Sequence, residues 1–259
     1  MVSNEIRIHP AMSIALTDIL KNPAIWRIGQ VPISTKAALA SGSAELDAVL
    51  PGNGWECGAL TEILANDQGI GELSILMPAL RDTTRGGRAV VLVAPPYMPL
   101  PSAWEAQGVL LSRVVIIHAE RQAALWAIEQ TARSGAVGMV VAWESHHRRD
   151  WNYPALRRLH VAAEQGSTAL MLYRRASALA DASPAPTRLV LSAKAGELQV
   201  RVAKRRGALM AETLQLNVYP AHWRARTVNA AFHALKKQSE KVLVPAHIHP
   251  PLRRLSASR

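Results

Sequence analysis

The stretch that decides the fold is residues 58–80, which read GALTEILANDQGIGELSILMPAL. Residues 60–64 are an apolar-rich run typical of a strand, and residues 66–71 are a short polar segment with two glycines. From residue 72 onward the chain reads as a helix. Nucleotide-binding α/β domains use this order of strand, loop and helix to bind phosphates, because backbone N–H groups at the start of the helix point at the anion.

The loop has the shape of a phosphate loop but lacks its chemistry. A Walker A loop carries Lys and then Ser or Thr after its last glycine, whereas Gly71 is followed by Glu72 and Leu73. A carboxylate at this point repels a triphosphate. We therefore predict the scaffold of an ATPase that has lost ATP, with no cofactor and no catalytic residue. The degenerate phosphate loop comprises Asn66, Asp67, Gln68, Gly69, Ile70, Gly71 and Glu72.

Charge is concentrated at the C-terminal end of the chain. The 259 residues carry a net charge of +11, and residues 221–259 contain eight Lys and Arg against one Glu. A basic segment favours an acidic partner, which is nucleic acid, an anionic surface or an acidic protein. We expect residues 220–259 to form a basic, flexible tail.

Two further features narrow the class of protein. Cys57 is the only cysteine, which excludes an intramolecular disulfide and a zinc site built from cysteines. We find no signal peptide and no run approaching the roughly 20 apolar residues of a membrane span. The expectation is a cytoplasmic protein that does not enter the membrane.

Strands and helices alternate through the middle of the chain. This rhythm predicts an α/β fold with a mostly parallel sheet flanked by helices. Two later strands at 188–193 and 198–203 form a hairpin, and a third at 214–218 completes an antiparallel edge. The parallel strands are expected at residues 60–64, 88–94, 113–118, 137–143 and 168–173, and the helices at 44–50, 72–85, 102–107, 121–133 and 153–164.

The predicted organisation has three parts. Residues 1–40 form an N-terminal helical extension and linker, residues 41–219 the α/β core, and residues 220–259 the tail. Within the extension, Leu16 and Leu20 are expected on one face of a short amphipathic helix, which lies outside the core and must dock on another surface. Residues 29–43 read as a polar linker.

Several segments resemble the RecA ATPase core in matching order. They are residues 41–50 before the loop, Glu62-Ile63 at its entrance, residues 132–137 before the Walker B strand, 158–173 and 200–218. This resemblance implies a RecA-like sheet over residues 41–219. It also places the family's phosphate-loop lysine on Gly71 and the hydroxyl on Glu72.

The other catalytic positions of that family are also replaced. The Walker B aspartate falls on Trp143, and the adjacent Glu144 substitutes for it only with a shift of register. The strand end that carries the family's catalytic glutamate reads Ala94-Pro95-Pro96. Three independent elements of phosphoryl transfer are therefore missing together.

A narrower resemblance is to the ImuA family, a RecA-like group of bacterial SOS mutagenesis. It is carried by the helix ending in Trp26, the turn at residues 50–55, strand 60–64, and above all Gly69-Ile70-Gly71-Glu72-Leu73 with residues 76–80. Membership implies an accessory role in translesion DNA synthesis, with RecA and an ImuB-like Y-family polymerase homologue as partners. Three alternatives stay open: a SulA-type inhibitor of cell division, an ATPase with an unusual phosphate loop, and a simple DNA-binding module.

Candidate contact residues fall into two sets. Arg148, Arg149 and Trp151 follow the strand at 137–143, where aromatic side chains among basic residues suit single-stranded DNA; the alternative is a solvated loop with Trp151 packed on the core. The tail adds Lys236 and Lys237. Candidates for binding a protein partner are Leu16, Leu20, Lys204 and Arg206, of which the two basic residues match positions that contact nucleotide across the interface in RecA filaments. No metal site is expected.

Overall fold

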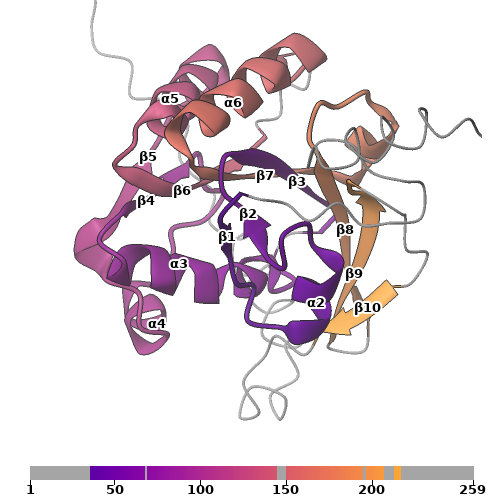
Figure 1. Cartoon of the computed structure of the whole chain (residues 1–259), viewed down its shortest axis with the longest axis horizontal. Coiled ribbons are helices and arrows are strands. Elements are labelled where there is room, and N and C mark those ends of the chain that lie inside the picture. Colours follow the sequence, from indigo (N-terminus) through magenta and orange to yellow (C-terminus); the bar gives the residue numbers. More distant parts are fainter. Residues whose placement is uncertain (1–35, 68, 145–149, 195–196, 207–212, 217–259) are drawn as a thin grey trace, which may run out of the picture. The chain divides into compact units, whose positions relative to one another are not determined.

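A computed structural model describes residues 36–67, 69–144, 150–194, 197–206 and 213–216 (Figure 1). All of them belong to the first of two units into which the chain divides, Met1–Tyr219. The statements below concern these residues only.

Eight strands form one sheet in the order β10-β9-β8-β3-β7-β6-β4-β5. Strands β5, β4, β6, β7, β3 and β8 run parallel, and β9 and β10 continue from β8 as antiparallel edge strands. The predicted α/β class and the antiparallel C-terminal edge are confirmed. The strands are β3 (Ala59–Ala65), β4 (Ala89–Val93), β5 (Val114–Ile117), β6 (Val137–Trp143), β7 (Ala169–Arg175), β8 (Thr187–Lys194), β9 (Glu197–Lys204) and β10 (Thr213–Leu216).

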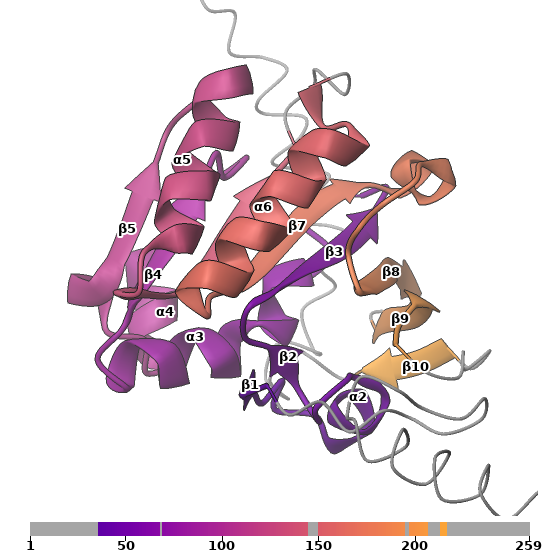
Figure 2. The same ribbon diagram turned by 45° about the horizontal axis from the view of Figure 1, so that its top comes forward.

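Helices cover both faces of the sheet, with α5 and α6 above it in Figure 1 and α3 and α4 below. Figure 2 shows α5 and α6 side by side across the parallel strands. Because side chains alternate along a strand, Leu60 of β3 packs with α5 and α6, whereas Ile63 packs with α3. The helices are α2 (Ala44–Val49), α3 (Met77–Arg85), α4 (Pro101–Ala106), α5 (Arg121–Arg133) and α6 (Tyr153–Gly166).

The predicted helix at residues 72–85 is divided. A 3-10 turn, Glu72–Ile75, comes first, and α3 begins at Met77 with Pro78 in its first turn. Proline fits there because its missing N–H has no helical acceptor at that position. Two further 3-10 turns lie at Leu111–Arg113 and Ala176–Ala180.

Part of the stretch predicted as a polar linker is a strand. Ala38–Leu39 (β1) pairs antiparallel with Trp55–Glu56 (β2), so Leu39 faces Trp55. Gly54 lets the two segments approach, because a Cβ on this residue would lie 2.5 Å from the Leu39 carbonyl oxygen. Helix α2 follows, with the Ser43 side chain accepting from the Leu46 N–H.

A buried histidine joins α6 to the central strand. His160 Nδ1 accepts a hydrogen bond from the Leu60 N–H at 3.2 Å. Burial lowers the pKa of His160 below its ordinary value, with Glu164 acting in the opposite direction. Because Nδ1 accepts, the neutral ring is the form that the fold holds.

This bond makes stability depend on pH. In the unfolded chain the His160 imidazole takes up a proton near pH 6.5, whereas in the folded chain it does so only at a lower pH. Because the unfolded state then binds more protons, acidification favours unfolding. We expect His160→Asn, whose Oδ1 can accept the same bond without titrating, to lose less stability than the unaltered chain between pH 7.5 and 5.5. Urea unfolding at the two pH values measures the two losses. Equal losses in both proteins would show that His160 is not the linked group.

Candidate functional site

The degenerate phosphate loop lies where a parallel sheet binds ligands. The carboxyl ends of β3, β4, β6 and β7 meet at one edge, and the loop follows β3 directly. The chain after β3 leads to α3 on one face, whereas the chain after β6 leads to α6 on the other. Divergence of loops in this way creates the crevice in which α/β sheets hold ligands.

A carboxylate of the same chain binds the loop. Gly69 and Gly71 adopt left-handed conformations, with φ of 74° and 85°. The Gly69 N–H donates to Oε1 of Glu72 at 3.3 Å. An N–H of this kind binds a phosphate oxygen in a nucleotide site. Glu72 therefore supplies an internal acceptor, a carboxylate, for this loop N–H.

Aromatic side chains pack next to Glu72. Trp143, at the predicted Walker B position, stacks on Tyr173 with ring centroids 5.3 Å apart and planes 14° apart. The Tyr173 hydroxyl donates to the Glu72 carbonyl oxygen at 2.7 Å. Burial, with a smaller contribution from the charge of Glu72, raises the pKa of Tyr173 well above its ordinary value. On this face of the sheet edge, Trp143 and Tyr173 therefore pack against the chain at Glu72.

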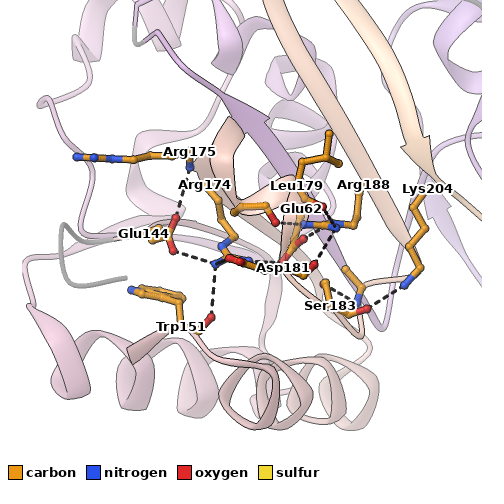
Figure 3. Close-up of polar contacts among 12 residues, drawn as sticks. Glu62, Glu144, Trp151, Arg174, Arg175, Leu179, Asp181, Ser183, Arg188 and Lys204 are labelled. Atoms are coloured by element: carbon orange, nitrogen blue, oxygen red, sulfur yellow. Dashed lines mark hydrogen bonds and ion pairs between the residues drawn. The ribbon is translucent and has the colours of Figure 1, made fainter. Parts of the chain in front are cut away.

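The opposite face of the same edge holds a network of buried charges (Figure 3). Glu62, in the middle of β3, is fully buried between two arginines from neighbouring strands. Its Oε1 accepts from Arg174 Nη1 of β7 at 3.0 Å, and its Oε2 accepts from Arg188 Nε of β8 at 2.5 Å. One carboxylate thus ties three adjacent strands together.

Arg174 extends the network to β6. Its Nη2 lies 2.9 Å from Glu144 Oε1, and it donates to the Trp151 carbonyl oxygen at 3.4 Å. Burial alone would lower the pKa of Arg174, but hydrogen bonds and charges from Glu144 and Glu62 outweigh it and raise the pKa. Glu144, the carboxylate nearest the Walker B position, is therefore the partner of an arginine.

Arg188 holds the turn after β7. It donates from Nη2 to the Ala178 carbonyl oxygen at 2.6 Å and from Nη1 to those of Leu179 and Asp181 at 3.2 and 3.3 Å. Lys204 Nζ donates to the Ser183 carbonyl oxygen at 2.9 Å. The charged side chains of this region are thus engaged with their own chain.

The candidate site residues predicted from the sequence lie in different parts of the structure. Asn66, Asp67 and residues 69–72 lie together in the loop. Trp151, in contrast, is 2% exposed and packs in the core with residues of α5 and α6, so its ring is not available to stack on a base. Arg206 pairs with Glu56 at 3.1 Å, and Lys204 binds Ser183 as above. Residues outside the described ranges are Leu16, Leu20, Gln68, Arg148, Arg149, Lys236 and Lys237.

Sequence reasoning missed the network of Glu62, Arg174 and Arg188. A signal was present, because Glu62 interrupts an apolar run typical of a strand buried on both faces. A carboxylate there needs a cationic partner. The two arginines, at the end of β7 and the start of β8, are the nearest cations in the sheet.

Fold and site together define an α/β protein with a mostly parallel sheet, whose carboxyl edge is filled by side chains of its own chain. No protein-family model matches the chain, and no curated protein matches it. Within the described residues, no group of three or more His, Cys, Asp and Glu side chains is placed to hold a metal ion. In the same residues, no helix has the length and apolar character to span a bilayer.

Removing Arg174 should be costly, because it takes away the buried cation that both Glu62 and Glu144 contact. We expect Arg174→Ala to lower the free energy of unfolding by about 3–5 kcal/mol. The control is Arg157→Ala, on the exposed side of α6, which should change it by less than about 0.5 kcal/mol. Urea unfolding at pH 7.5 measures both. A loss below about 1 kcal/mol for Arg174→Ala would show that the network does not hold the edge.

Proposed function

We propose that this chain is a non-catalytic, RecA-like accessory protein of SOS-induced translesion DNA synthesis. In this proposal it is an adaptor that binds RecA and an ImuB-like polymerase homologue. Two kinds of support stand behind it. The motifs that resemble the RecA core and the ImuA family occur in order along the chain, and the sheet has the parallel core and antiparallel C-terminal edge that such a fold requires.

The main support for the proposal is that side chains of the protein itself occupy the carboxyl edge of the sheet, next to the loop. Glu72 accepts the Gly69 N–H, Trp143 stacks on Tyr173, and the chain after β4 reads Ala94-Pro95-Pro96. In the sequence resemblance to the RecA core, each of these positions corresponds to one that carries a catalytic group in that family. A chain that keeps the scaffold and lacks these groups retains surfaces for protein binding.

The proposal assigns the two partners to separate surfaces. Subunits of RecA filaments associate through an N-terminal segment and the faces around the nucleotide, so a RecA-like chain can dock there without hydrolysis. We assign this role to the N-terminal segment that contains Leu16 and Leu20. The C-terminal part, with edge strand β10 and the basic tail, is assigned to the polymerase-like partner, because sheet edges and charge are common means of recognition.

The test measures association with purified RecA, the ImuB-like protein and the tubulin-like division protein. The unaltered chain should bind the first two and not the third. Leu16→Asp with Leu20→Asp should weaken RecA binding about tenfold or more and spare the other partner, because charges replace the apolar contact. The control is Thr17→Asp with Asn22→Asp, which adds the same charge at polar positions of the segment.

Removal of residues 220–259 should have the reverse effect and weaken only the ImuB-like association. If both variants retain both associations, the two-surface assignment is wrong. If the unaltered chain binds only the division protein, the accessory role in DNA synthesis is wrong and the SulA-type alternative replaces it.

A further inference from the structure

The segment between β4 and α4 presents apolar side chains to solvent. Tyr97, Met98 and Leu100 are 64%, 65% and 66% exposed. Three large apolar residues within four positions form a patch of the kind that marks an interaction site. The thioether of methionine is well suited to such a surface because it adapts to different partners.

The backbone of this segment is held in place. Prolines stand at positions 95, 96, 99 and 101, and each fixes one backbone torsion. Ala94, at the base, has φ of 53° although it is not glycine, and its N–H donates to the Ile117 carbonyl oxygen at 2.9 Å. Strain of this kind persists where the surrounding structure fixes it, and it concentrates at binding sites.

A hollow of about 250 Å³ lies beside the exposed side chains. Its walls include Trp104 and Trp143, which are 6% and 8% exposed, together with Leu73 and residues 95–100. Small-molecule sites are commonly about 300–1,000 Å³, so this hollow suits an anchoring side chain better than a whole ligand.

Among the described residues that line the hollow, Glu72 is the single charged one. Its Oε1 accepts the Gly69 N–H, and its Oε2 makes no hydrogen bond within the part of the chain that the structure describes. Because no cation is among the described residues that line the hollow, the carboxylate of Glu72 makes this lining complementary to a positive group.

We propose that this hollow and the exposed residues Tyr97, Met98 and Leu100 bind a short segment of a partner protein. The segment carries apolar side chains and one Lys or Arg. An apolar side chain fills the hollow against Trp143, the basic group pairs with Glu72, and the remaining apolar contacts fall on the proline-fixed loop. Because the loop is already ordered, little conformational entropy is lost on its side of the contact. This inference deepens the proposed function and rests only on its adaptor part.

The probe is a phage-displayed library of random 12-residue peptides, selected on the immobilised full-length chain. Enriched peptides should combine apolar residues with Lys or Arg. Fluorescence polarisation then measures the affinity of one labelled synthetic peptide. Met98→Asp should weaken binding about tenfold or more, because the apolar contact would enclose an unpaired charge. Glu72→Gln should weaken it about fivefold and remove the advantage of basic over neutral peptides.

The matched control is Trp126→Asp, which changes an equally exposed apolar residue on α5 and should leave the affinity unchanged. Three results would overturn the inference: no enrichment, equal affinity for Met98→Asp, or enrichment of acidic peptides. Self-association of the chain that Met98→Asp abolishes would also overturn it, by making a second copy the occupant.

Repeating the association assay with Met98→Asp separates this inference from the proposed function. The variant should weaken binding to RecA or to the ImuB-like protein about tenfold. Intact association with both partners would overturn the hollow as a partner site and leave the adaptor role standing. Peptide binding of the expected kind by a chain that binds neither partner would overturn the adaptor role alone.

Discussion

The sheet edge depends on one buried carboxylate held between two arginines. Glu62 lies inside β3 with no solvent exposure, and Arg174 and Arg188 approach it from the strands on either side. A lone charge in this position would cost several kcal/mol, so the three residues are stable only as a set. Through Arg174 the set reaches β6, and through Arg188 it reaches the 3-10 turn Ala176–Ala180.

The two faces of the edge have opposite chemistry because side chains alternate along each strand. In β6, Trp143 faces the loop while the next residue, Glu144, faces the arginines. A shift of one residue would bring Glu144 to the loop but would also turn every side chain of β6 to the opposite face of the sheet. In the observed register, Glu144 pairs with Arg174 on the face opposite Trp143.

The local features of this fold could be predicted from the sequence. Helix α5 and strand β6 have the predicted bounds, because an apolar helical pattern ended by Ser-Gly and a continuous apolar run are strong signals. Strands β1 and β2 were missed because two residues are too short to show any periodicity. For the site, the position of the loop directly after the strand was predicted, but the hydrogen bond from Gly69 to the Glu72 carboxylate was not.

Contacts between segments that are distant in the sequence could not be predicted from it. Glu62 and Arg188 are 126 positions apart, and nothing near either residue identifies the other. For Trp151 the sequence left two alternatives open, because its neighbours are polar and basic, and the structure places its side chain in the core.

The most direct test of the account is whether the purified chain binds nucleotide. Isothermal titration with MgATP and with MgADP measures this without assuming hydrolysis. An edge filled by Glu72, Trp143 and Tyr173 predicts no saturable binding up to millimolar nucleotide, because the loop N–H is engaged and a carboxylate faces the phosphates. Saturable binding at micromolar concentration would contradict it and would favour an ATPase with an unusual phosphate loop.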